Sequence, residues 1–128
     1  MNKISSHLDF YGQALLLRSR RNEVLASNIA NAATPNFKAR DLDFDTEIRR
    51  QIKQGPLQTT DQQHFPTNVA PGSEKMMYRD PINPSLDGNT VEMGVEQMEF
   101  SENVMRYQTT LQFLNGRITG LMSAIRGE

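Results

Sequence analysis

The 128-residue chain contains no cysteine and no tryptophan, and its aromatic residues make up only 7% of the sequence. The absence of cysteine excludes disulfides, thiolate catalysis and cysteine-ligated metals. The hydrophobic fraction of 37% and the mean hydropathy of -0.60 are low for a globular domain, so a large private core is not expected. We therefore expect contacts with other molecules to supply part of the stability.

The sequence also lacks an excess of charge and a long apolar run. With a net charge of -1 at pH 7, the chain has no overall field that would attract nucleic acid or an acidic membrane. No apolar run approaches the roughly 20 residues that span a bilayer. Residues 1–9 have neither the apolar centre nor the cleavage site of a secretory signal. If the protein leaves the cytoplasm, we expect a route without a cleaved signal peptide.

No constellation of catalytic, cofactor-binding or metal-ligating residues is recognisable. Alternating aspartates resemble the start of a calcium loop: Asp41, Asp43 and Asp45. The sixth and twelfth positions, which require glycine and a carboxylate, hold Thr46 and Ile52, so the pattern fails. The two histidines, His7 and His64, have no neighbouring ligand. We predict no enzyme activity, no cofactor, no metal, no nucleic acid and no small-molecule substrate.

Proline is absent from both ends of the chain. All six prolines fall in the middle: Pro35, Pro56, Pro66, Pro71, Pro81 and Pro84. Because proline costs about 3 kcal/mol inside a helix, this distribution separates two kinds of structure. We predict helices over residues 1–34 and 88–128, which form one discontinuous helical assembly domain. Residues 35–87 are predicted to be an extended, proline-containing middle segment.

The C-terminal end carries an unbroken apolar seam at spacings of four and three. Its members are Phe100, Val104, Tyr107, Leu111, Leu114, Ile118, Leu121 and Ile125. Such a repeat of 3.5 residues holds one helix against another in a supercoil. Asn89 and Glu92 follow a turn-forming cluster at the spacing of a capping box, so we expect them to begin this helix.

A weaker seam runs along the N-terminal end. Its members are Ile4, Leu8, Tyr11, Leu15, Arg18, Asn22, Leu25, Ile29 and Ala32. Arg18 and Asn22 interrupt it, and polar residues on a seam commonly fix register. Leu17 and Val24 lie on a second stripe, which indicates more than one neighbour. The predicted fold is mainly α, with long N- and C-terminal helices paired in a coiled-coil-like bundle. The middle segment is expected to be irregular or extended, with short β structure as an alternative.

The middle segment has no sustained periodicity. Asp45 is predicted to cap a short helix over residues 46–54, with Leu42 and Phe44 facing inward. Residues 57–84 contain four prolines and scattered polar residues, which favours an extended segment. Two alternatives stay open, a solvated loop and a strand-like arm that orders against a neighbouring subunit. The apolar run at residues 76–78 would tether the segment to a helix or contact a partner.

Basic residues cluster at two places. The first cluster is Arg18, Arg20 and Arg21, and the second is Arg49, Arg50 and Lys53. Nucleic-acid binding would require more positive charge and a recognisable module. We therefore interpret these residues as a solvated face or as partners in ion pairs between subunits.

The motif at residues 26–39, ASNIANAATPNFKA, has the features of a helix end. The residues that would form this end are Asn28, Ile29, Asn31, Thr34 and Pro35. The motif closely resembles the N-terminal signature of flagellar axial proteins, the rod, hook and hook-associated family, usually Asn-Ile-Ala-Asn, two residues, then Thr-Pro-Gly-Tyr. Here Asn36 and Phe37 replace the glycine and tyrosine. Asparagine tolerates the left-handed conformation, so the turn is expected to persist.

The resemblance covers roughly residues 10–50 and 80–128 and points to the rod branch of this family. The short chain has no room for the large middle domains of hook and distal-rod proteins. Residues 85–91, followed by Glu96, Asn103 and Tyr107, resemble the short proximal-rod members.

The resemblance implies a structural subunit of the proximal rod, which assembles through its terminal helices into the drive shaft that transmits motor torque. The implied partners are copies of itself, other rod subunits, basal-body adaptor and inner-membrane ring proteins, and the flagellar type III export apparatus. The implied location is the rod in the periplasmic space, after export without a cleaved signal peptide. Packing would rest on Leu111, Leu114, Ile118 and Leu121, opposite Leu15, Leu25 and Ile29. A soluble helical adaptor or export chaperone of the flagellar export system is the alternative.

Overall fold

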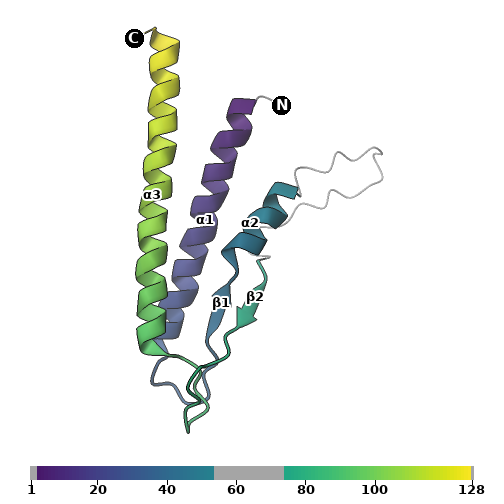
Figure 1. Ribbon diagram of the computed structural model, residues 1–128, viewed down its shortest axis with the longest axis vertical. Helices are drawn as coiled ribbons and strands as arrows, with labels where there is room; N and C mark the ends of the chain where they lie inside the picture. Colours follow the sequence, from purple (N-terminus) through teal and green to yellow (C-terminus); the bar gives the residue numbers. More distant parts are fainter. Residues whose placement is uncertain (1–2, 54–73, 128) are drawn as a thin grey trace, which may run out of the picture.

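The computed structural model describes residues 3–53 and 74–127. This part of the chain is mainly helical, with a small two-stranded sheet (Figure 1). The elements follow the order α1 Lys3–Ala30, β1 Arg40–Leu42, α2 Phe44–Lys53, β2 Met76–Tyr78 and α3 Met93–Arg126. The predicted fold class is confirmed, because long N- and C-terminal helices lie side by side and the middle segment contains short β structure.

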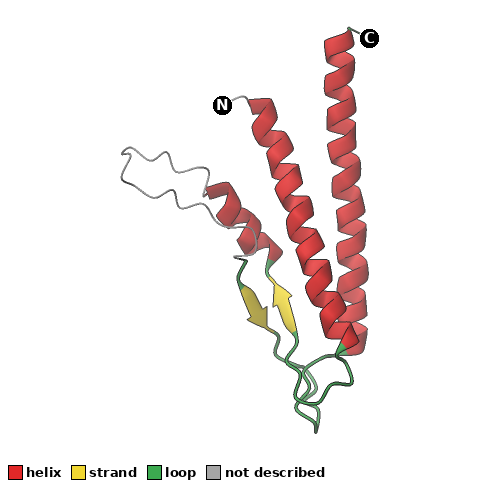
Figure 2. Ribbon diagram, turned by 180° about the vertical axis from the view of Figure 1, so that it is seen from behind, coloured by secondary structure: helices red, strands yellow, loops and turns green. Residues whose placement is uncertain are grey.

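The two long helices, α1 and α3, form the largest interface in the described part of the chain. Figures 1 and 2 show from opposite sides that they lie close together at one end and diverge toward the end that carries both termini. We call the close end the base and the other the free ends. α3 has 34 residues and α1 has 28. None of the described helices is both long enough and apolar enough to cross a membrane.

Burial along the predicted seams follows this divergence. Toward the base, Leu25 of α1 is fully buried and Phe100 of α3 is half-buried. Toward the C-terminus the exposed fraction rises to 39% at Leu111, 40% at Ile118 and 85% at Ile125. A single chain therefore covers only part of its own apolar seam.

The second stripe of α1 packs against the middle segment. The core on this side consists of Ala14, Leu17, Leu42 and Ile48, with Phe44 packed against it. The Arg18 guanidinium lies 3.9 Å from the centroid of the Phe44 ring, close enough for a cation–π contact. The expectation that Leu42 and Phe44 face inward is confirmed. The second stripe predicted an additional neighbour for α1. On the side of α1 that carries this stripe, that neighbour is the chain's own β1 and α2.

The short helix α2 begins earlier than predicted, and its cap was assigned to the wrong aspartate. The Asp43 carboxylate accepts hydrogen bonds from the Thr46 backbone N–H at 3.2 Å and from the Thr46 hydroxyl at 2.7 Å. Because Phe44 is already helical, Asp45 lies within the first turn, where a carboxylate interacts favourably with the helix dipole. The predicted end at residue 54 lies outside the described residues.

The apolar run at residues 76–78 forms a strand. β1 and β2 pair antiparallel, with Arg40 opposite Tyr78 and Leu42 opposite Met76. The run therefore tethers the middle segment to β1. One alternative had predicted a tether directly to a helix. Met77 and Tyr78 keep exposed fractions of 46% and 67%, so a contact with a partner stays a prediction. Of the loop or arm predicted for residues 57–84, residues 57–73 lie outside the described residues.

Helix α3 begins at Met93, later than the predicted residue 88. The predicted capping box is wrong, since Glu92 makes no side-chain capping hydrogen bond. The Glu92 carboxylate instead accepts hydrogen bonds from the backbone N–H groups of Ile82 at 3.3 Å and Asn83 at 3.2 Å. The side chain of Asn89, the other member of the predicted box, is bound to the end of α1, so residues 88–92 do not join the helix.

Candidate helix-packing site

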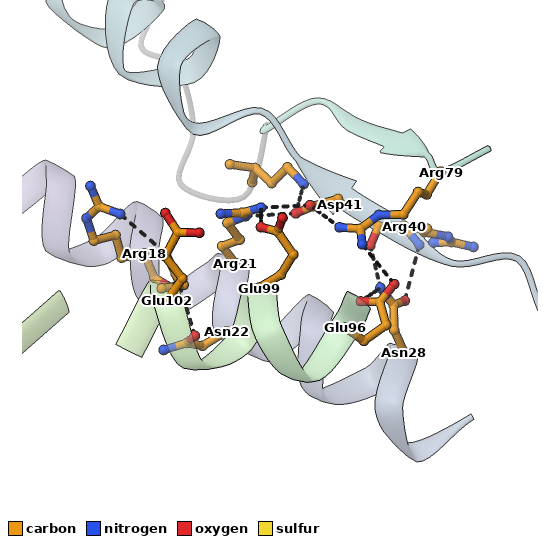
Figure 3. Close-up of polar contacts among 12 residues, drawn as sticks. Arg18, Arg21, Asn22, Asn28, Arg40, Asp41, Arg79, Glu96, Glu99 and Glu102 are labelled. Carbon is orange, nitrogen blue, oxygen red and sulfur yellow. Dashed lines mark hydrogen bonds and ion pairs between the residues drawn. The ribbon is translucent and has the colours of Figure 1, made fainter. Parts of the chain in front are cut away.

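Asn28, near the end of α1, joins three segments of the chain. Its side-chain amide donates to the Arg40 carbonyl oxygen at 2.6 Å and to the Glu96 carboxylate at 3.0 Å. Its side-chain oxygen accepts a hydrogen bond from the Arg40 N–H at 3.1 Å. Asn28 is only 1% exposed, and Figure 3 shows it beside Glu96 and the strand that carries Arg40. Because buried polar groups require partners, this one side chain holds α1, β1 and α3 in a fixed arrangement.

The turn after α1 is stabilised by local side-chain hydrogen bonds. α1 ends at Ala30 and not at residue 34, because the next residues form hydrogen-bonded turns. The Asn31 amide donates to the Ser27 carbonyl oxygen at 2.8 Å, and its side-chain oxygen accepts from the Thr34 hydroxyl at 3.1 Å. Asn36 has a φ of 59°, so the expected left-handed conformation is confirmed.

The turn after α1 meets the segment before α3 at Gly88. The Asn36 N–H donates to the Asp87 carbonyl oxygen at 2.9 Å. Gly88 has a φ of +73°, and a Cβ there would lie 2.5 Å from the side-chain oxygen of Asn36. A side chain at this position would both clash and strain the backbone, so the contact requires glycine.

Asn89, which lies shortly before α3 in the sequence, binds the C-terminal end of α1. Its amide group donates to the carbonyl oxygens of Asn31, Ala32 and Thr34 at 2.9–3.0 Å. Its side-chain oxygen accepts from the Val91 N–H at 2.7 Å. Helix ends leave carbonyl groups without intrahelical partners, and this buried asparagine supplies the donors.

A third buried asparagine, Asn103, lies on the α1–α3 interface. Its amide donates to the Arg18 carbonyl oxygen and to the Asn22 side-chain oxygen, both at 2.8 Å. Its own side-chain oxygen accepts from the Arg18 guanidinium at 3.3 Å. The two polar residues that interrupt the N-terminal seam therefore face a polar partner across the interface. Such a pairing fixes the register of the two helices, because a shifted register would leave buried polar groups unpaired.

A cluster of charges connects the small sheet to both long helices (Figure 3). The Arg21 guanidinium binds the Asp41 carboxylate through two nitrogens at 2.8 and 2.9 Å and the Glu99 carboxylate at 2.7 Å. Arg79 pairs with Asp41 and, at 3.2 Å, with Glu96. Glu96 is fully buried. Arg21, which the sequence assigned to a solvated face or to contacts between subunits, is thus bound within its own chain.

The surroundings of Asp41 favour its charged form. Burial alone would raise the pKa of its carboxyl group, but hydrogen bonds from Arg21 and from the Leu42 N–H, with the charges of Arg21 and Arg79, lower the pKa below its ordinary value of 3.8. Conversely, the hydrogen bond that Arg21 donates to Asp41 raises the pKa of Arg21. The pair is therefore fully ionised at neutral pH.

We predict that Asp41 makes the stability of the chain depend on pH in the acid range. Because its folded-state pKa is lowered, its contribution is fully present above the unfolded-state pKa and is lost as pH falls through the folded-state value. The difference in unfolding free energy between the wild type and Asp41→Asn should shrink as pH falls below the ordinary carboxyl pKa of 3.8. Urea denaturation at a series of pH values measures it. A difference that does not change with pH would contradict this assignment.

The predicted site residues differ in exposure. Leu25 and Asn28 are buried. The partly exposed group consists of Leu8, Leu15, Ile29, Asn31, Phe100, Val104, Tyr107, Leu114 and Leu121. The exposed group consists of Thr34, Pro35, Leu111, Ile118 and Ile125. Their roles in packing between subunits stay predictions.

Sequence reasoning missed the buried polar side chains of α3. Glu96 and Asn103 are both 0% exposed, although neither was assigned to the seam. They stand seven residues apart, and the steps from Glu96 through Phe100 and Asn103 to Tyr107 are four, three and four. A stripe that starts at Glu96, takes these steps and does not require apolar residues would have contained both of them. Within residues 3–53 and 74–127, no group of histidine or acidic side chains is arranged to hold a metal ion.

The chain is similar to known flagellar proteins along its whole length. Residues 8–38 match the family model described as flagella basal body rod protein. The flagellar basal body rod protein FlgB of Cereibacter sphaeroides (strain ATCC 17029 / ATH 2.4.9) is 56% identical over 128 residues, which cover all of both chains. FlgB of Escherichia coli (strain K12) is 41% identical, over 98% of this chain and 97% of that protein. FlgB of Aeromonas hydrophila is 49% identical, over 90% of this chain and 89% of the relative. The chain therefore belongs to the FlgB family of flagellar basal body rod proteins.

Proposed function

We propose that this chain is built into the proximal rod through its two long helices. As a member of the FlgB family it is a structural component of the flagellar basal body rod, associated with other rod components. The observation that supports helix-mediated assembly is the partly covered seam of α3, with Leu111, Ile118 and Ile125 exposed in a single chain. An apolar seam of this kind is stabilised when another helix covers it.

The uncovered part of the seam is large compared with the stability of a small domain. The exposed fractions of Leu111, Ile118 and Ile125 are 39%, 40% and 85%. Covering these side chains would add roughly 2–5 kcal/mol, at 1.5–3 kcal/mol for each fully buried side chain. Because small domains are stable by only about 5–15 kcal/mol, a neighbouring helix would contribute a substantial fraction.

In this proposal, residues 1–34 and 88–128 act as one discontinuous assembly domain, and β1 and α2 of the middle segment support it from one side. The buried polar groups at the base fix the register of α1 and α3, and the apolar seams toward the free ends contact neighbours. Close-packed side chains resist twisting because neighbouring contacts cannot slip one at a time. Such a subunit would transmit torque without a catalytic step, a cofactor or a small-molecule substrate.

The proposed partners are further copies of this chain, other rod subunits, the basal-body adaptor and inner-membrane ring proteins, and the flagellar type III export apparatus. The proposed location within the basal body is the rod in the periplasmic space, reached without a cleaved signal peptide. Family membership supports both. The alternative of a soluble adaptor or export chaperone is not supported, since the relatives described above are named as rod proteins.

Deleting the gene and imaging isolated basal bodies by electron microscopy tests the proposal. We expect rings without a rod, because later rod subunits would lack the surface on which they assemble. Expression of the wild-type chain from a plasmid should restore the rod, and an empty plasmid should not. Intact rods and hooks in the deletion strain would overturn the proposal.

A further inference from the structure

The outer edge of the small sheet is open. Figures 1 and 2 show from opposite sides that β2 lies on the far side of β1 from the two long helices. Within residues 3–53 and 74–127, β1 is the only strand that pairs with β2, so one edge of β2 has no neighbouring strand there. Met77 and Tyr78 of β2 are 46% and 67% exposed. Both the edge and its side chains are therefore accessible.

The pairing of β1 with β2 determines which main-chain groups point outward. Arg40 lies opposite Tyr78, but its N–H and its carbonyl oxygen are both bound by the Asn28 side chain and so point away from β2. Arg40 and Tyr78 therefore form a non-hydrogen-bonded pair. In an antiparallel ladder, the residues of such a pair direct their main-chain groups toward the two outer edges. The N–H and C=O groups of Tyr78 consequently point away from β1, as do those of Met76, two residues earlier.

The two outer edges of the sheet differ in what covers them. On β1, the amide of Asn28 takes the place of a neighbouring strand, because it binds both main-chain groups of Arg40. Among the residues that the structure describes, none provides such a group for the outer edge of β2. An exposed edge is usually protected by proline or by charged side chains, but the sequence of β2 is Met76, Met77 and Tyr78. Extended segments of other proteins add to edges of this kind.

Positive charge lies beside this edge. The Arg40 guanidinium lies 5.5 Å from the centroid of the Tyr78 ring, and Lys75 immediately precedes β2. Both basic residues are exposed, and neither forms an ion pair with a described residue. A carboxylate on an added strand would be attracted to these cations, and opposite charges orient two surfaces as they meet. An apolar side chain next to that carboxylate would cover Tyr78.

We propose that an extended segment of another rod protein adds to the outer edge of β2 as a third strand, with an apolar side chain over Tyr78 and a carboxylate near Arg40. The inference rests on the proposed assembly of the chain into the rod and names one contact with a neighbour. Hydrogen bonds to the main chain of Met76 and Tyr78 hold the segment, and the side chains on either side of it supply specificity.

The choice of a different rod protein follows from the edges that this chain offers. The outer edge of β1 is occupied by Asn28, so among the described strands of a second copy only β2 could pair with β2. Such pairing is self-complementary and closes a two-fold dimer. A closed dimer leaves no edge for a further subunit, whereas a shaft requires contacts that continue from one subunit to the next.

Proline in place of Tyr78 tests the main-chain contact. Because the Tyr78 N–H points outward, Tyr78→Pro removes a donor from the open edge without breaking the pairing with β1. Tyr78→Ala removes the same side chain and keeps this N–H. We expect both purified chains to unfold at the same urea concentration. In isolated basal bodies we expect about tenfold less of the proline variant than of the alanine variant, because the partner's carbonyl oxygen is left without a donor. Equal amounts would overturn the proposal.

Photo-cross-linking identifies the partner without altering the edge, and so tests the proposal even where proline destabilises the sheet. The photoreactive residue p-benzoylphenylalanine replaces Met77 in the full-length chain, and isolated basal bodies are irradiated. We expect mass spectrometry of the cross-linked peptide to find a non-helical segment of another rod protein that contains an acidic residue. The same photoreactive residue in place of Met122, which is a methionine of α3 with the same exposed fraction of 46%, should not cross-link to that segment.

The results separate this contact from the proposed function. If the chain with the photoreactive residue at position 77 is present in basal bodies but does not cross-link, strand addition is wrong and assembly into the rod stands. A cross-link to a second copy, or to a protein outside the rod, overturns the choice of occupant. If the wild-type chain is missing from basal bodies, the proposed function itself fails.

Discussion

We expect Leu114→Asp to abolish swimming motility without reducing the amount of the protein in the cell. Leu114 is partly exposed in the single chain, and with Leu8, Leu16 and Ile118 it lines a shallow groove on the helix pair. An aspartate there keeps contact with water in the free chain. A neighbouring helix that covers the seam would remove this water, and an unpaired buried carboxylate costs several kcal/mol. The substitution therefore acts on assembly more than on folding.

Swimming in soft agar, immunoblots of whole cells and immunoblots of isolated basal bodies measure this effect. Asn115→Asp is the matched control, because it introduces the same charge at the next residue, which is exposed and outside the seam. We expect the control strain to swim and to retain the protein in its basal bodies. A motile Leu114→Asp strain would show that the seam is not an assembly contact.

We expect Arg79→Met to lower the free energy of unfolding by about 3–5 kcal/mol, the loss typical when one partner of a buried ion pair is removed. Arg79 pairs with Asp41 and with Glu96, which is fully buried. Without Arg79, the Glu96 carboxylate keeps the hydrogen bond from the Asn28 amide and loses its ion pair. Methionine keeps an unbranched apolar stem, so the loss reports mainly the missing charge.

Urea denaturation of the purified chain measures this loss. Adding Glu96→Gln should recover part of it, since the neutral amide no longer needs a cation, and the double-mutant cycle gives the coupling between the two residues. Arg20→Met removes an exposed pair with Glu23 and should change stability by less than about 1 kcal/mol. Equal effects of Arg79→Met and Arg20→Met would contradict the importance of the buried pair.

The parts of the fold that depend on local sequence were predicted well. The proline-free ends and the four-three spacing of apolar residues place α1 and α3 beside each other, as observed. The left-handed Asn36 followed from the conformational tolerance of asparagine. These features depend on neighbours within one or two helical turns, so the sequence contains the information needed to predict them.

The parts that depend on distant partners were not predicted. Asn89 and Glu92 have the spacing of a capping box, but Asn89 instead binds carbonyl groups at the end of α1, more than 50 residues away. Glu96 is buried because Arg79 and Asn28 approach it from two other segments. A capping pattern reports only what a side chain can reach locally. Whether that side chain instead forms hydrogen bonds with groups far away in the sequence depends on the tertiary fold.

Because α1 and α3 diverge, the position of their free ends can be adjusted. Their relative placement is determined at the base, where Asn28 and Asn103 bind across the interface, and the free ends rest on few contacts within the chain. A helix of 34 residues is about 50 Å long, so a tilt of about 10° at the base moves its far end by about 9 Å. In the proposed rod, small changes of tilt would let chemically identical chains adapt to non-equivalent sites with their cores unaltered.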